Sequence, residues 1–217
     1  LTTALLAGGL IPQAQDWSQW GGAQHRNMYS FAKGLPDKFD PGKLVKGTDN
    51  YDPATQKNVK LTVKLGSQSY GNPTIANGRI YVGTNNDVPR DKRHLGDRSI
   101  LLCLDEKTGN LNWQLVISKL KSGKVNDWES LGLFSSAVIE GNRLYIVTTR
   151  CEVLCLDVEG MANGNDGPYK DEAKYVVQDV LGPDGKQAPP IPPGPKDADI
   201  IWRYDMMDEL GVFPHNA

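Results

Sequence analysis

The sequence contains little cysteine, little histidine and no excess of charge of either sign. Its 217 residues include 3 Cys and 3 His, and 24 Lys and Arg stand against 26 Asp and Glu. The balanced charge argues against nucleic acid as a partner, because a nucleic-acid surface needs a net basic field. No C-x-x-C pair occurs, so the signatures of thioredoxin-type redox chemistry, a zinc ribbon and c-type haem attachment are absent.

The few cysteines do not suggest a disulfide scaffold. Cys151 and Cys155 would face the same side of a strand about 13 Å apart, so a disulfide between them would need a sharp bend. We expect both to be small, buried core residues. Residues 163–167, NGNDG, lack the alternating carboxylates of a calcium loop, and the sequence predicts no metal site.

Long apolar runs are also missing. Residues 1–15, LTTALLAGGLIPQAQ, are uncharged and largely apolar, but they are too short to span a bilayer. The polar residues that follow at once make this stretch typical of the end of a secretory signal. We therefore predict a signal-peptide remnant, an exported protein that is periplasmic or associated with the cell envelope, and no transmembrane span.

What the sequence does contain is a repeated pattern of strands. Residues 72–84, NPTIANGRIYVGT, and residues 136–148, SAVIEGNRLYIVT, each read as two apolar strands around an Asn-Gly or Gly-Asn turn. The third and fourth strands that we expect after each pair cover residues 99–105 and 151–157, then 111–116 and 199–205. Such self-similarity is typical of stacked repeats.

The segment that leads into each next unit is repeated as well. Residues 130–137, SLGLFSSA, and residues 209–217, ELGVFPHNA, share a Leu-Gly-aliphatic-Phe core and are expected to form entering strands. Short helical turns are expected just before them, over residues 127–131 and 206–210. The strands are apolar on both faces, as in strands between neighbouring sheets. Four-stranded antiparallel units stacked face to face define a β-propeller. A β-sandwich is the competing fold, but it does not predict a Trp on each fourth strand.

The predicted chain is all-β, an incomplete β-propeller of four-stranded antiparallel blades. An N-terminal segment over 16–60 precedes a partial propeller over 61–217. The parts of this propeller are a blade over 61–117, a blade over 131–205 with an inserted loop over 158–198, and the start of the next blade over 209–217. We expect the Gly- and Pro-rich insertion to lie outside the blade core. Because a closed ring of about six to eight blades needs far more chain, we interpret this one as a fragment.

A motif around the third strand carries a family resemblance. The pattern Ala-x-Asp-x-x-Thr-Gly-x-x-x-Trp is the tryptophan-docking motif of pyrroloquinoline-quinone-like β-propellers. The residues that match it, with Cys103 in place of Ala, are Asp105, Thr108, Gly109 and Trp113. A partial second copy keeps Asp157 and, after the insertion, Trp202. The chain resembles exported bacterial members of this quinoprotein-type family over most of residues 16–217.

The motif has a physical interpretation that needs no ligand. Gly109 allows the chain to turn, and Asp105 and Thr108 can hydrogen-bond the backbone of that turn. Trp113 would present its ring to the neighbouring blade, where aromatic burial is stabilising. A phosphate loop is excluded, because the motif has one Gly and no Gly-x-Gly or Gly-Lys-Ser/Thr pattern.

The resemblance implies two functions. One is an exported binding or assembly platform without catalysis of its own, with another protein, a small molecule or a sugar as partner at the propeller face. The alternative is a quinoprotein oxidoreductase, an alcohol or sugar dehydrogenase dependent on pyrroloquinoline quinone and Ca²⁺. Its catalytic residues would lie mostly beyond residue 217, and the sequence lacks the adjacent cysteines common under the quinone.

By analogy with propellers, function is expected where loops converge on the axis. The sequence identifies no catalytic residue, and the axial binding candidates are Asn72, Ser135, Ser136, His215 and Asn216, with Arg150, Asn85 and Asn86 as second choices. His215 could be a base or a metal ligand, but it has no paired acidic residue in the sequence, so a structural role is the stronger expectation.

Overall fold

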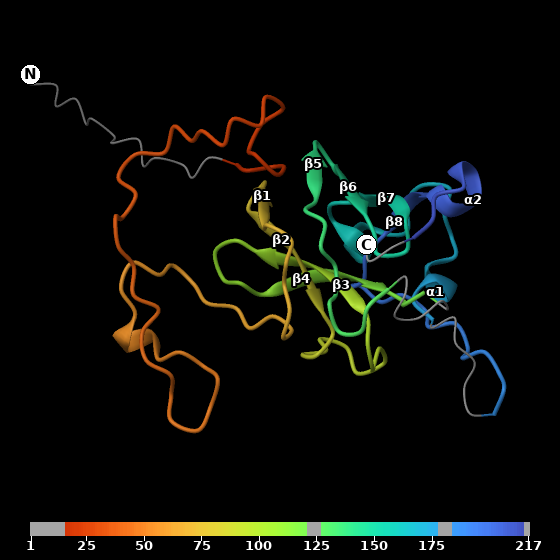
Figure 1. Ribbon diagram of the computed structural model, residues 1–217, viewed down its shortest axis with the longest axis horizontal. Helices are drawn as coiled ribbons and strands as arrows, with labels where there is room; N and C mark the ends of the chain where they lie inside the picture. The colour runs from red at the N-terminus through yellow and green to blue at the C-terminus, as the bar shows by residue number, and fades with distance from the viewer. Residues whose placement is uncertain (1–15, 121–126, 178–183, 215–217) are drawn as a thin grey trace, which may run out of the picture.

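The computed structural model describes residues 16–120, 127–177 and 184–214 of the chain. These residues form two four-stranded antiparallel sheets with a few short helical segments (Figure 1). The first sheet, in the order of its chain, contains β1 (Thr74–Ala76), β2 (Arg79–Asn85), β3 (Ser99–Asp105) and β4 (Leu111–Ile117). The second contains, also in chain order, β5 (Val138–Glu140), β6 (Arg143–Val147), β7 (Glu152–Asp157) and β8 (Ile200–Asp205). The all-β expectation and the positions of the eight strands are confirmed.

The two hairpin turns have the backbone conformation that their residues favour. Asn77 and Gly78 have φ angles of 53° and 73°, as a type I′ turn requires. In the second hairpin Gly141 has a φ of 59°, which glycine adopts at no steric cost. These turns place β1 and β5 antiparallel to β2 and β6.

The main core lies between the two sheets. Tyr81, Leu101 and Trp113 of the first sheet are almost completely buried, in one cluster with Leu144 and Leu156 of the second. The opposite face of the first sheet is covered by the segment before β1. The residues that pack there are Val82, Ile100, Leu102, Leu104 and Val116, against Val63 and Leu65. The first sheet is therefore buried on both faces.

Equivalent residues occupy equivalent places in the two sheets. The residues that lie side by side across strands two, three and four are Tyr81, Cys103 and Trp113 in the first sheet, and Tyr145, Cys155 and Trp202 in the second. In both sheets the register shifts directly after the cysteine, between Cys103 and Leu104 and between Cys155 and Leu156. The sequence repeat is thus also a repeat of strand register.

The second sheet differs because one of its faces is open among the described residues. Val147, Trp202 and Tyr204 expose 43%, 38% and 39% of their surface. They lie on the side of Tyr145, because Tyr145 pairs through Cys155 with Trp202, and strand residues two apart share a face. This side is equivalent to the side of the first sheet that packs on the second.

We expected the insertion between β7 and β8 to lie outside the core. Part of it enters the core instead. It contains a 3₁₀ turn, η3 (Gly160–Asn163), and one helical turn, α1 (Glu172–Tyr175). Tyr175 and Ala198 join the core cluster between the sheets. Asp197 forms a parallel bridge with Gln114, so the end of the insertion lies along β4 and links the first sheet to the second.

The N-terminal segment also connects the sheets. Trp17 forms an antiparallel bridge with Ile75 of β1, and Ile139 of β5 donates its backbone N–H to the carbonyl of Ser18. Residues that follow extend to one side of the sheets, drawn in orange in Figure 1, and contain the short helix η1 (Pro53–Thr55).

The junction segments match the expectations only in part. Residues 206–210 form the short helix α2 (Met206–Leu210), which Asp205 caps by accepting from two backbone N–H groups. Residues 127–131 form a turn rather than a helical turn, and residues 130–137 form no strand. Glycine explains the difference, because Gly132 has a φ of 77° and lies against the backbone of Thr84. Residues 211–214 form no strand, and residues 1–15 and 215–217 lie outside the described residues. No helix in the described part of the chain is long and apolar enough to cross a membrane.

Candidate functional site

Three of the predicted axial residues lie where the first strands of the sheets begin. A Cβ atom at Gly71 would lie 2.8 Å from the carbonyl oxygens of Phe134 and Ser135, so the backbone before β1 touches the backbone before β5. The exposed Asn72 therefore lies close to the half-buried Ser135. Ser136 follows directly, whereas His215 and Asn216 lie outside the described residues.

Arg150 does not join this group. It follows β6 and donates to the hydroxyl of Ser118, just after β4, at 2.7 Å, and to Glu152 at 3.3 Å. In the first sheet β4 is the edge strand opposite β1. The second choices Asn85 and Asn86 end β2 and begin the loop after it, where both side chains hydrogen-bond backbone carbonyls.

Glu152, to which no sequence motif points, forms the centre of a buried polar network. Its side chain is fully buried and accepts from Arg203 Nε at 2.7 Å and from the Tyr175 hydroxyl at 2.8 Å. Burial, together with the neighbouring Glu152 carboxylate, holds the pKa of Tyr175 well above its usual range. Arg150 and Arg203 pair with the Glu152 carboxylate, which offsets the cost of burying its charge. The network joins three elements, because Tyr175 belongs to α1, Glu152 to β7 and Arg203 to β8.

The Asp-x-x-Thr-Gly segment closes its own turn. Asp105 Oδ1 accepts from the backbone N–H and the hydroxyl of Thr108, both at 2.7 Å, and these bonds lower the pKa of Asp105. Gly109 has a φ of 71°, and a Cβ there would lie 2.6 Å from Val63. In the second sheet Asp157 accepts from Arg143 at 2.7 Å. The polar groups of the motif are thus used within the protein.

The two tryptophans of the motif have different environments. Trp113 is buried, and its indole Nε1 donates to the backbone carbonyl of Val158, after β7, at 2.8 Å. Gly160 lies against the same ring, because a Cβ at this position would be 2.8 Å from it. Trp202 is partly exposed, with its ring centroid 6.1 Å from that of Tyr145.

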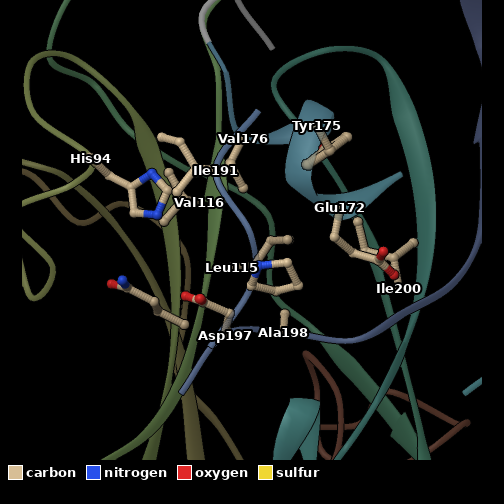
Figure 2. Close-up of a pocket in the computed structure, with 12 residues that line it drawn as sticks. His94, Leu115, Val116, Glu172, Tyr175, Val176, Ile191, Asp197, Ala198 and Ile200 are labelled. Carbon is tan, nitrogen blue, oxygen red and sulfur yellow. The ribbon is translucent and has the colours of Figure 1, made fainter. Parts of the chain in front are cut away.

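A small cavity lies between β4, the loop after β2 and the insertion (Figure 2). Its volume of about 20 Å³ is enough for a single water. His94 and Glu172 line it, and His94 Nδ1 and Glu172 Oε1 are buried without a hydrogen-bond partner. Burial lowers the pKa of His94. No motif in the sequence pointed to this place, because the loop and the insertion are far apart in the chain.

Beside the cavity, Arg93 bridges two carboxylates. Its Nη2 atom lies 2.6 Å from an oxygen of Asp91 and 3.1 Å from an oxygen of Asp197, which also lines the cavity. Arg93 also donates to the carbonyl of Pro192 at 2.9 Å. The loop after β2 is thereby attached to the proline-rich end of the insertion.

Comparisons with known proteins do not assign the chain to a family. No protein-family model and no curated protein sequence matches it. Among solved structures, the crystal structure of BamB from Moraxella catarrhalis is similar at a TM-score of 0.29 and 14% sequence identity. The match covers 62% of this chain and 37% of that chain, so this chain spans well under two thirds of the BamB structure.

Proposed function

We propose that the two sheets are adjacent blades of a β-propeller, and that the exported protein is a binding or assembly platform without catalysis of its own. The proposal combines the tryptophan-docking resemblance with the stacking of two sheets in the same register. A protein is the proposed partner.

The observation that carries the proposal is the open face of the second sheet. Its Trp202 and Tyr145 occupy the places that Trp113 and Tyr81 occupy in the first sheet, where both are buried against the second sheet. An exposed apolar sheet face of this kind favours a further packed layer. We propose that another four-stranded blade covers it with aliphatic side chains, as the second sheet contributes Leu144 and Leu156 to the cluster that contains Trp113.

The N-terminal segment supports a protein partner. Residues 28–39 contain several large apolar side chains that expose 60% or more of their surface; these are Met28, Tyr29, Phe31, Leu35 and Phe39. The rings of Tyr29 and Phe31 contact each other edge to face, with centroids 4.8 Å apart, and large exposed apolar patches mark protein interaction sites. The proposed platform therefore uses this segment, beside the sheets, to bind another protein.

The described residues do not supply the site that a quinoprotein dehydrogenase needs. The sequence has no adjacent cysteines, and the three cysteines are free and buried in the structure. Among the described residues, one group of three has metal-ligating side chains close together, and it lies beside β4 rather than near Asn72 and Ser135. These observations support the platform over the dehydrogenase in our proposal.

The experiment is a comparison of native protein, expressed from its natural gene, with a Tyr29→Ser, Phe31→Ser variant. We expect affinity purification to recover a stoichiometric protein partner with native protein and to lose it with the variant. A Tyr51→Ser variant, at a partly exposed aromatic in the same N-terminal segment but outside residues 28–39, is the matched control and keeps the partner. Dye reduction after addition of pyrroloquinoline quinone and Ca²⁺ would contradict the proposal.

A further inference from the structure

Three side chains with metal-ligating atoms meet beside β4. A ring nitrogen of His94 and carboxylate oxygens of Asp91 and Asp197 all lie within 4.8 Å of one another. Asp91 and His94 belong to the loop between β2 and β3, and Asp197 belongs to the insertion before β8. Figure 2 shows the His94 ring and the Asp197 carboxylate along the same side of the cavity.

His94 is the buried member of this cluster. The residue exposes only 2% of its surface, and its Nδ1 atom has no hydrogen-bond partner. Buried polar atoms are nearly always paired, so one without a partner needs a physical explanation.

The backbone around these side chains is held in place. Asn86 Nδ2 donates to the carbonyl of His94 at 2.6 Å and to the carbonyl of Gly96 at 3.0 Å. Asp197 Oδ2 accepts from the backbone N–H of Gly194 at 2.7 Å. The bonds from Asn86 fix the backbone at His94, and the bond from Gly194 fixes one carboxylate oxygen of Asp197. The cluster is therefore supported from both of the segments that form it.

Arg93 places a positive charge between the two carboxylates. Its guanidinium contacts both Asp91 and Asp197, but its side chain exposes 45% of its surface. If this side chain turned outward to solvent, it would lose these two ion pairs and its hydrogen bond to the carbonyl of Pro192. A cation that bound at this place would therefore compete with Arg93. Among the described residues, no other ion pair joins both carboxylates.

We propose that Asp91, His94 and Asp197 bind a divalent transition-metal ion such as Zn²⁺, which takes the place of the Arg93 guanidinium. Imidazole nitrogen and carboxylate oxygen are zinc ligands at about 2.0–2.2 Å, which in tetrahedral geometry sets ligand atoms about 3.4 Å apart. The three side chains must therefore close in slightly on the ion, and a fourth position is left for water. The sequence predicts no metal site. No local pattern could indicate this one, because its three ligands come from segments that are far apart in the chain.

The ion would connect the two sheets. It joins the loop of the first sheet to the insertion that leads into the last strand of the second, in place of the link that Arg93 makes and beside the Gln114–Asp197 bridge. The bound metal thus stabilises the contact between the proposed blades. The site is independent of the protein partner proposed above, so either proposal can fail without the other.

The test is zinc titration of the whole chain by calorimetry after removal of metal with a chelator. We expect one Zn²⁺ per chain. His94→Asn and, separately, Asp91→Asn each lower the affinity about a hundredfold or more, by analogy with the loss of groups that hold a metal site together. Circular dichroism confirms that each variant is folded, and Asp91→Asn decides the result if His94→Asn does not fold.

Two further variants make the result specific. His25→Gln, at an exposed histidine outside the cluster, leaves zinc binding unchanged. Arg93→Gln removes the competing cation and raises the affinity about tenfold, because it removes a positive charge a few ångströms from the ion. An ion-pair cluster with no metal role predicts the reverse pattern: no zinc binding by native protein, and lower stability for Arg93→Gln with no gain in affinity. Either that pattern or zinc binding that survives Asp91→Asn would overturn the proposal.

Discussion

The rings of Tyr81 and Trp113 lie 6.0 Å apart, with Cys103 between them across three strands, and both are almost completely buried. The second sheet repeats this arrangement with Tyr145 and Trp202 at 6.1 Å, but there Trp202 is partly exposed. Trp113 is thus packed between the two sheets, whereas the equivalent Trp202 lies on an open face of the second sheet. This difference leads to the first prediction.

Trp113→Ala is expected to lower the free energy of unfolding by about 3–5 kcal/mol, the usual cost of truncating a buried aromatic residue. The hydrogen bond from its indole to the Val158 carbonyl is lost as well. Trp202→Ala in the same chain is expected to cost about 1 kcal/mol or less, because part of its ring is already in water. Urea denaturation of both variants measures the difference, and equal losses would contradict the different burial of the two rings.

Gly132 and Gly141 form a matched pair for the contact between the sheets. Both have positive φ, so alanine strains the backbone at either position by about 1–2 kcal/mol. At Gly132 the new Cβ would also lie 2.4 Å from the backbone of Thr84, whereas at Gly141 nothing lies within 4 Å. Thermal denaturation should therefore show a clearly larger loss for Gly132→Ala. Equal stability of the two variants would contradict the close packing of residues 132–135 on β2.

Glu152→Gln is expected to destabilise the chain by about 3 kcal/mol, because it removes the buried charge at the centre of the network and leaves Arg203 with Asp205 alone as an ionic partner. Glu159→Gln is the control, since Glu159 pairs with Arg79 at an exposed position, where ion pairs contribute about 0–1 kcal/mol. Chemical denaturation at neutral pH compares them. A small effect of Glu152→Gln would show that the network is not a structural centre.

Burial should make the three cysteines unreactive in the folded chain. It raises the pKa of Cys103 to about 12, and it raises the pKa of Cys151 and of Cys155 as well. The reactive thiolate is therefore scarce near neutral pH. Labelling with a thiol reagent should modify no cysteine in native protein and three in denaturant. Rapid labelling of Cys103 without denaturant would contradict its burial.

Asp199 predicts a pH dependence of stability. The residue is fully buried, its Oδ1 has no hydrogen-bond partner, and burial raises its pKa above the usual value of 3.8. The folded state therefore binds a proton more tightly than the unfolded state, so this group lowers stability as the pH rises from 3.8 through its raised pKa. Asp199→Asn should stabilise the chain at pH 7 by about 1 kcal/mol and lose this gain at pH 3.5. Equal effects at both pH values would contradict the raised pKa.

The strands were predictable because their signals are local. Alternating turns and apolar runs place all eight strands, and Asn77-Gly78 and Gly141 give the hairpins directly. The turn chemistry of Asp105 and Thr108 was also visible, since those residues hydrogen-bond across three positions. The predicted strand over residues 130–137 is absent, because Gly132 adopts a positive φ against β2, a tertiary contact that no local pattern contains.

The rest depends on contacts between distant segments. Part of the insertion enters the core because Tyr175 reaches the buried Glu152, and composition alone suggested an outer loop. Likewise Asp91 and His94 meet Asp197 only because the insertion lies along β4. The axial role of Asn72, Ser135 and Ser136 stays a prediction, although the structure brings Asn72 and Ser135 close together.

The open face of the second sheet provides the most direct test of the proposed propeller. Hydroxyl-radical footprinting can compare Trp202 and Tyr204 in the protein expressed from its natural gene with the same residues in this 217-residue chain. A propeller predicts strong protection of both in the former and oxidation of both in the latter, with Trp128, which is 53% exposed, oxidised in each. Equal oxidation of Trp202 and Tyr204 in the two proteins would contradict a further blade on this face.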